Sequence, residues 1–133
     1  MKKNKKEFVS PVGWYLASIL MRLEWDDEDK HNLNRRCKAW ENTILIKANS
    51  PSEAYSKAMK LGKLDEEGEV WEVNNENHKA KWHFEGLTSL LAVYDEPEDG
   101  AEIIWNEHEN RSVKTIKSWV LPKEQLEVFD REE

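Results

Sequence analysis

The side chains best suited to acid–base chemistry lie in one stretch of the sequence. Glu72, His83 and Glu85 fall in segments with the alternation of β-strands, and a carboxylate beside a second acid or an imidazole is the usual general acid–base arrangement. Since 27 of the 133 residues are acidic, such pairs also arise from composition alone. We treat these three residues as the candidate pocket of an alternative hypothesis, a small-ligand sensor or enzyme, and assign no catalytic residue.

The patterns that metals, nucleophiles and phosphates require are missing from the sequence. The four histidines form no H-E-x-x-H pair, and no serine elbow or glycine-rich phosphate loop is present. Asp95 and Asp99 match two positions of a calcium loop, but its twelfth position, normally Glu, is Asn106. Cys37 is the single cysteine. We therefore expect no metal and no cofactor, and we favour a function that is not enzymatic.

Charge is spread unevenly along the chain. Lys and Arg number 20 against 27 Asp and Glu, a net charge of −7. Residues 1–63 carry +5, residues 64–110 carry −12, and residues 111–133 carry 0. A segment this acidic repels a phosphate backbone and attracts a cationic surface. We expect a basic protein as the partner, and neither nucleic acid nor a membrane.

Tryptophan is the second unusual feature, with seven in the chain. A single helix over a sheet has one good core face, so not all seven are expected to fit into it. Five of them are candidates for one large aromatic core, which we expect most of the five to form: Trp14, Trp40, Trp71, Trp82 and Trp105. Trp25 and Trp119 are the expected surface residues, because exposed Trp beside acids is typical of an interface hot spot.

These two features together define the candidate partner-binding residues. They comprise two acidic turns and the two expected surface tryptophans. The full set is Trp25, Asp26, Asp27, Asp29, Asp95, Glu96, Glu98, Asp99 and Trp119.

The elements that must position these residues follow from hydrophobic periodicity. Apolar residues alternate in most of the segments, which indicates strands. The expected strands are Trp14–Trp25, Cys37–Ala48, Gly68–Asn75, His78–Glu85 with an extension over Leu87–Tyr94, Ala101–Glu107 and Val113–Val120. Gly86 is expected to mark a bulge. Between the first two strands, residues 26–36 predict a charged hairpin loop.

One main helix is predicted between the second and third strands. Ser50 and Glu53 form a capping box around Pro51, a residue suited to the first helical position. The helix is expected to run to Leu61, with Gly62 as its stop. The predicted order is ββαβββ(β), an α+β fold with one antiparallel sheet, one helix on a face, and a short C-terminal helix or arm over residues 122–129.

Two further expectations concern organisation and compartment. We expect a basic disordered tail over residues 1–10 and a single domain over residues 11–133, because the length suits one core. A lone thiol suits a reducing cytoplasm, and no apolar run reaches the ~18 residues of a membrane span. The apolar stretch at residues 12–21 after the basic start has no small-residue cleavage site behind it, so we expect a cytoplasmic protein.

The order of several short motifs resembles a known family. A WY-x-A strand opens at Trp14, an S-x-x-E-A helix begins at Ser50, and an F-x-G strand contains Phe84 and Gly86. Together they resemble a small bacterial domain family of unknown function, over residues 14–105. The resemblance implies the fold and a bacterial setting, and it supplies no activity, cofactor or site residue.

Three functional hypotheses remain at this point. The preferred one is an acidic inhibitor or immunity-type protein that blocks a basic toxin or nuclease. The second is an accessory subunit of a larger bacterial complex, possibly one used in defence, which docks through a sheet edge and the C-terminal residues 113–129. The third is the sensor or enzyme with a pocket on the open sheet face. The sequence does not indicate an oligomeric state.

Overall fold

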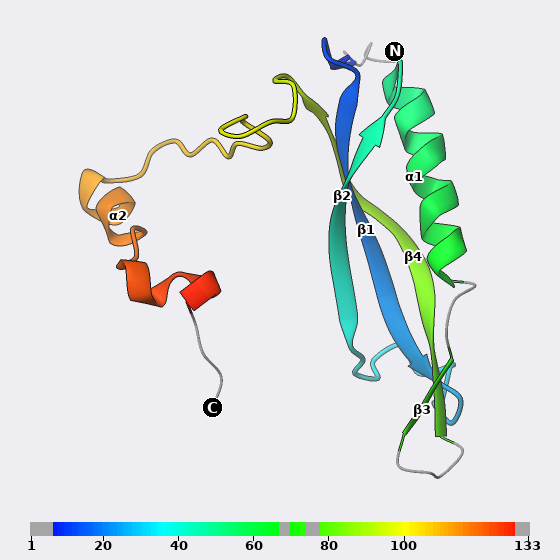
Figure 1. The fold of residues 1–133 in the computed structure, drawn as a ribbon. Coiled ribbons are helices and arrows are strands. Elements are labelled where there is room, and N and C mark those ends of the chain that lie inside the picture. Colours follow the sequence, from blue (N-terminus) through cyan, green and yellow to red (C-terminus); the bar gives the residue numbers. More distant parts are fainter. Residues whose placement is uncertain (1–6, 67–69, 74–77, 130–133) are drawn as a thin grey trace, which may run out of the picture.

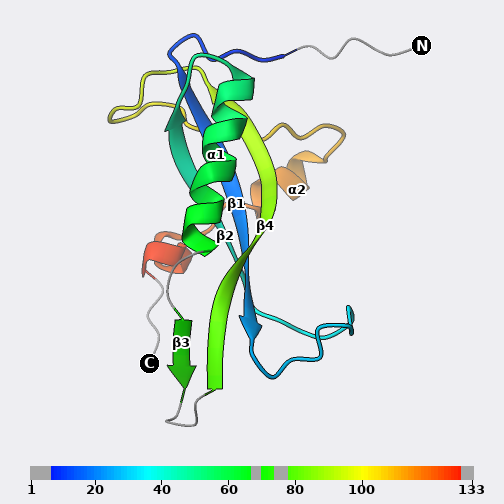
Figure 2. The same ribbon diagram turned by 90° about the vertical axis from the view of Figure 1, so that its right-hand side faces the viewer.

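Residues 7–66, 70–73 and 78–129 are described by the structure, a computed structural model of the chain. Within them, antiparallel strands β1 (Trp14–Trp25), β2 (Ala39–Lys47), β3 (Val70–Val73) and β4 (His78–Val93) form one sheet in the order β2-β1-β4-β3. Helix α1 (Pro51–Glu66) lies along one face of this sheet (Figures 1 and 2). The predicted α+β class, one antiparallel sheet with one main helix, is confirmed.

The alternation of β1 produces the core. Its odd-numbered residues Tyr15, Ala17 and Ile19 are buried on the helix side, and the first two pack against Ala54 and Ala58 of α1. Alanine has a short side chain, so the helix lies close to the sheet there. This region, residues 7–93, is called the body.

Strand β4 keeps its apolar side chains toward the helix by means of two bulges. The pairing with β1 skips Glu85 and Thr88, so Phe84, Leu87 and Leu90 lie three residues apart and still face the same side. The bulge expected near Gly86 is confirmed, and φ there is 143°, which favours glycine. The extension of this strand beyond Glu85 is confirmed as well.

Helix α1 begins as predicted and ends later. The Glu53 amide donates to Ser50 Oγ at 3.1 Å, and Glu53 Oε2 accepts from the Asn49 amide at 3.1 Å, so the N-terminal cap forms. The predicted stop at Gly62 is wrong, since the helix continues to Glu66. Gly62 is instead buried against the ring of Phe84, where an added Cβ would lie 2.4 Å from a ring carbon. The residue is small because the helix must pass close to β4.

The predicted tryptophan core is wrong. Trp40 and Trp105 are about half exposed, Trp14 and Trp82 are half-buried, and the side chain of Trp71 lies outside the described residues. Trp40 and Trp82 pack against each other with ring centroids 4.9 Å apart, and Trp82 borders the buried cluster of Ile19, Met21 and Phe84. The core face is filled by Tyr15, Phe84 and aliphatic side chains, because alanines in α1 leave no room for indole rings.

The two last predicted strands are also wrong. Residues 101–107 belong to an irregular segment, residues 94–112, which we call the connector. Residues 113–120 contain a helix, α2 (Val113–Ser118), because Ser112 caps it: the Thr115 amide donates to Ser112 Oγ at 3.1 Å. Two 3₁₀ turns follow, η1 (Lys123–Gln125) and η2 (Glu127–Phe129), which agrees with the expected terminal helix or arm. Residues 113–129 are called the arm.

The start of the body lies within the predicted tail. Residues 1–6 of that tail lie outside the described residues. Ser10, however, is buried: its hydroxyl donates to the Val93 carbonyl, and its amide donates to the Tyr15 hydroxyl at 3.0 Å. These bonds tie the chain before β1 to the end of β4. No helix in the described ranges has the length and apolar character needed to cross a bilayer.

Candidate functional site

The structure separates the candidate partner-binding residues into three places. Trp25 pairs with Ala80 at one end of the β1–β4 ladder, whereas Trp14 pairs with Val93 at the other, just before Asp95. A strand of this length spans about 35–40 Å, so the two acidic turns lie at opposite ends of the sheet. Trp119 is on the arm, which has no contact with the sheet in the described part of the chain. No single surface unites the three groups.

The turn after β1 is closed by charge-assisted hydrogen bonds. Glu28 accepts from the Trp25 amide at 3.0 Å and from Arg35 Nε at 2.8 Å. Burial raises the pKa of the Glu28 carboxyl, but these hydrogen bonds outweigh it and the pKa lies below its ordinary value. Asp26, Asp27 and Asp29 are exposed around this turn. Trp25, expected on the surface, is half-buried.

The alternative acid–base residues are engaged in separate pairs. Arg22 Nε donates to Glu85, and His83 Nδ1 lies 3.2 Å from Glu66 Oε2. The hydrogen bond from Arg22 lowers the pKa of Glu85, and the same bond raises the pKa of Arg22. The side chain of Glu72 lies outside the described residues. Neither of the two pockets described below is lined by His83 or Glu85.

The connector carries the largest set of unpaired acids. It contains seven carboxylates and no lysine or arginine before Arg111: Asp95, Glu96, Glu98, Asp99, Glu102, Glu107 and Glu109. All seven are exposed, and none forms an ion pair with a described residue. Two of them accept hydrogen bonds, Glu96 from the Trp14 indole at 3.2 Å and Asp95 from the Glu102 amide at 3.3 Å.

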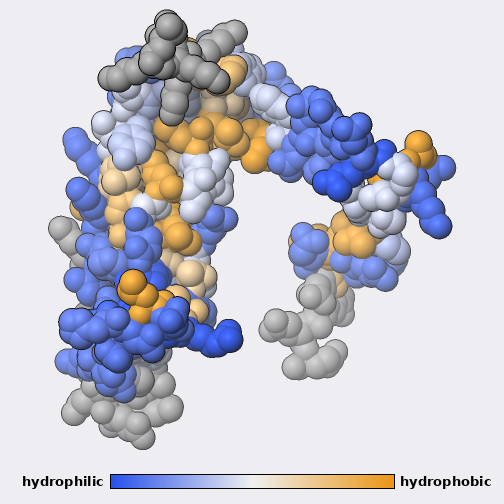
Figure 3. Space-filling view, turned by 180° about the vertical axis from the view of Figure 1, so that it is seen from behind, coloured by the Kyte–Doolittle hydropathy of each residue, from blue (hydrophilic) through white to orange (hydrophobic). Residues whose placement is uncertain are grey.

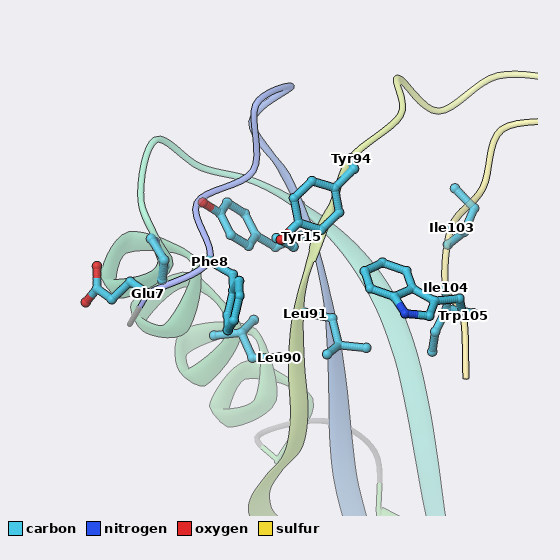
Figure 4. A pocket seen from close by; sticks show the side chains of 11 residues that line it. Glu7, Phe8, Tyr15, Leu90, Leu91, Tyr94, Ile103, Ile104 and Trp105 are labelled. Carbon is cyan, nitrogen blue, oxygen red and sulfur yellow. The ribbon is translucent and has the colours of Figure 1, made fainter. Parts of the chain in front are cut away.

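An apolar cavity lies where the connector leaves the body (Figure 4). Its volume is about 350 Å³, and Glu7 is its one charged lining residue. The body contributes Phe8, Tyr15, Leu90 and Leu91, and the connector contributes Tyr94 and residues 103–105. The rings of Tyr94 and Trp105 stand 5.8 Å apart across this junction. A second, shallower pocket lies between β2 and α1, where Leu45, Leu61 and Leu64 meet Lys57 and Lys60.

Sequence reasoning placed the acids of the connector but missed the cavity. Ile103 and Trp105 alternate as a strand would, but in the structure Ile104 lines the cavity together with them, so no strand-like alternation is present. In the sequence, the one signal for the cavity is the pair of aromatic residues Tyr94 and Trp105, which lie on either side of the acidic turn. Among the described residues, no three His, Cys, Asp or Glu side chains gather as a metal ion needs.

The chain belongs to a protein family. Residues 14–105 match the family described as a domain of unknown function, DUF4288, which confirms the resemblance found in the motifs. This span covers β1 to β4 and connector residues 94–105, and it leaves the arm outside it. No curated protein and no solved structure matches the chain.

Proposed function

We propose that this member of the DUF4288 family is a non-enzymatic bacterial protein that binds a basic partner through its connector. The activity that fits is that of an inhibitor or immunity-type protein in the cytoplasm, with the connector occupying the cationic cleft of a toxin or nuclease. The observation that carries the proposal is the contrast in pairing: seven exposed carboxylates of the connector have no cationic partner among the described residues.

Three carboxylates of the body, in contrast, are paired within the chain. Glu28, Glu66 and Glu85 each lie within ion-pair distance of a cationic or titratable side chain of the body. The connector acids repel one another, and this repulsion is relieved when a cationic surface docks against them. Charged groups placed in this way accelerate association more than they add affinity.

The connector is also held in a defined place. The Trp14 indole donates to Glu96, and Lys47 Nζ lies 4.8 Å from the centre of the Trp14 ring. The Ala101 amide donates to the Glu98 carbonyl at 3.0 Å and closes the acidic turn. A segment fixed at its base loses less conformational freedom on binding than a free tail does.

The test is a capture experiment with the tagged full chain in a lysate of its source organism, at low and at high salt, read by mass spectrometry. We expect one basic protein in stoichiometric amount at low salt and its loss at high salt. The connector variant replaces Asp95, Glu96, Glu98 and Asp99 by Asn and Gln, and we expect it to reduce the association rate of that protein about tenfold or more at low salt.

A matched control removes acids from the other end of the sheet. Asp26, Asp27 and Asp29 are changed to Asn, with Glu41→Gln as the fourth substitution, so that four charges are lost in each variant. If both variants weaken binding equally, net charge rather than the connector attracts the partner. Unchanged capture by the connector variant, or no basic protein captured by the wild type, would overturn the proposal.

The cavity supports a second candidate function, the binding of a small apolar molecule. A volume of about 350 Å³ is at the lower end of the range of ligand pockets, and its walls are aromatic and aliphatic. We expect indole or decanol to raise the melting temperature of the wild type, and Leu90→Trp to abolish that rise by filling the cavity. No rise with either probe contradicts this second function.

A further inference from the structure

The apolar cavity lies at the end of the sheet where β4 has a neighbour on one side only. Strand β3 pairs with residues 78–81 of β4, so within the described part of the chain the later residues of β4 pair with β1 alone. Consecutive strand residues point to opposite faces, yet Leu90 and Leu91 both line the cavity. The cavity therefore extends around the free edge of β4, and connector residues 103–105 form its outer wall (Figure 4).

The walls of this cavity combine aromatic rings with aliphatic side chains. Phe8 and Tyr15 come from the body, whereas Tyr94 and Trp105 come from the connector. The rings of Tyr94 and Trp105 are tilted by 53° to each other, with centroids 5.8 Å apart. The face of an aromatic ring attracts an ammonium group that lies within about 6 Å of its centre. Such walls suit an apolar molecule and, at the connector end, a cation attached to it.

Carboxylates accompany the lining of the cavity. Glu7 belongs to it, Asp95 directly follows Tyr94, and Glu102 directly precedes Ile103. Asp95 Oδ2 accepts from the Glu102 amide at 3.3 Å, so these two connector residues lie together. All three acids are exposed, and none forms an ion pair with a described residue. Figure 4 shows the Glu7 carboxyl group pointing away from Trp105, which leaves Asp95 and Glu102 as the acids of the connector end.

Positive charge is missing from this lining. The described residues that line the cavity include no lysine and no arginine. Lys47 Nζ donates to the Val12 carbonyl at 3.1 Å and lies 4.8 Å from the centre of the Trp14 ring, so it is held at the start of β1. In Figure 3, apolar surface on the body adjoins the hydrophilic surface of the connector. A ligand with an apolar body and a positive end complements both surfaces, whereas an anion is repelled.

We propose that the cavity binds an organic cation, an ammonium group carried on a small apolar body. The body packs against Leu90, Leu91 and the aromatic rings, and the ammonium group lies at the connector end, beside Asp95 and Glu102. The inference rests on the second candidate function, the binding of a small apolar molecule, and adds the charge of that molecule. It does not require the basic protein partner.

The test compares three molecules that share a phenyl ring and a four-carbon chain but differ in charge at pH 7. They are 4-phenylbutylamine, 4-phenylbutanol and 4-phenylbutanoate, and isothermal titration calorimetry with the full chain measures each dissociation constant. We expect the amine to bind about 3- to 30-fold more tightly than the alcohol, because exposed cation–π contacts and surface charges contribute on this scale. We expect the butanoate to bind more weakly than the alcohol. The advantage of the amine should shrink in about 0.5 M salt.

Charge variants locate the ammonium group. Asp95→Asn with Glu102→Gln removes both acids of the connector end and keeps an oxygen that accepts from the backbone amide at position 102. We expect the advantage of the amine over the alcohol to fall to about twofold or less, with the affinity of the alcohol unchanged. Glu7→Gln is expected to cause a smaller fall. The matched control, Asp26→Asn with Asp29→Asn at the opposite end of the sheet, should leave the ratio as it is.

Filling variants show whether the amine enters the cavity. Leu90→Trp and Leu91→Trp each place an indole in it, from opposite faces of β4, and both are expected to abolish binding of the amine. Leu91 is 42% exposed, so its replacement is the milder change for the fold. Circular dichroism of each variant checks that the body is folded.

The outcomes separate this inference from the function on which it rests. If none of the three molecules binds, the second candidate function fails and the inference fails with it. If the alcohol binds and the amine binds no more tightly, the cavity is a ligand site and the preference for a cation is wrong. Tightest binding of the butanoate overturns the inference as well. So does an amine that still binds to both filling variants, or one that keeps its full advantage without Asp95 and Glu102, because it then lies elsewhere.

Discussion

The body and the segment that follows it use the same residue types in opposite ways. In the body, a core of apolar side chains is buried between α1 and the sheet, and several carboxylates, Glu28 and Glu85 among them, lie in ion pairs. In the connector and arm, apolar side chains are exposed and the acids have no cationic partner among the described residues. Among the described residues, the buried apolar core and the ion pairs therefore lie in the body. What remains unsatisfied after them is the surface that partners are expected to use.

The largest effect on the contrast between body and arm is expected when a side chain at the centre of the body's core is removed. Phe84 is buried between Ile19, Met21 and the α1 residue Gly62. We expect Phe84→Ala to lower the free energy of unfolding by about 3–5 kcal/mol, measured by urea denaturation. Phe129→Ala, at a 46% exposed position of the arm, is the control. Equal losses in the two variants would show that the arm is packed as tightly as the body.

A smaller effect is expected at the helix–strand contact itself. Gly62→Ala places a Cβ 2.4 Å from the Phe84 ring, and overpacking of this kind costs about 1–3 kcal/mol. Alanine gains about 1 kcal/mol in helix propensity, so the expected net loss is about 0–2 kcal/mol. Lys63→Ala at the exposed neighbour is the control. In a Phe84→Leu background the loss should shrink, and an unchanged loss would exclude the ring as its cause.

A still smaller effect distinguishes the paired carboxylates of the body. The pKa of Glu85 is lowered by Arg22, and that of Glu28 is lowered by Arg35 and a backbone amide in spite of burial. A lowered pKa in the folded state stabilises the fold above the ordinary value of 4.5, and this contribution is lost as the pH falls through the folded pKa. Since Glu85 is 40% exposed, solvent screening limits its share to about 1 kcal/mol or less.

The measurement is urea denaturation at pH 7 and at pH 3 for the wild type and for Glu85→Gln. We expect the variant to be slightly less stable at pH 7 and to lose less stability on acidification. The same acid dependence in both proteins would mean that the Arg22–Glu85 pair does not contribute.

The smallest effect on stability is expected in the connector. The variant that neutralises Asp95, Glu96, Glu98 and Asp99 removes acids that form no ion pair with a described residue, so the free energy of unfolding should change by less than about 0.5 kcal/mol. A clear loss would contradict the division between paired acids of the body and unpaired acids of the connector.

The sequence predicted the parts of the fold that rest on local signals. The period of two in β1, the cap at Ser50 and Glu53, and the bulge near Gly86 each follow from a few neighbouring residues. The α+β class and the family followed from the order of those signals.

The errors have two physical reasons: tertiary neighbours decided some outcomes, and a local cap decided another. Gly62 looked like a helix stop because nothing in the sequence shows Phe84 beside it. The segment from Val113 combines β-branched residues with a capping serine, and the cap determined the helix. The prediction of one candidate site was wrong for a tertiary reason, as the helix stop was. Trp25 and Asp95 look alike in composition, but the antiparallel pairing of β1 with β4 sets them at opposite ends of the sheet.

The exposure of the tryptophans has a consequence for spectroscopy. None of the tryptophan side chains that the structure describes is buried, and Trp105 and Trp119 lie on the connector and the arm. Fluorescence of the tryptophans that the structure describes therefore reports mainly on partly or fully exposed positions, while the core at Tyr15 and Phe84 contains no described indole. A fluorescence transition that precedes the loss of far-ultraviolet circular dichroism would mark release of the periphery, and the interval between the two signals would measure how independently the two regions melt.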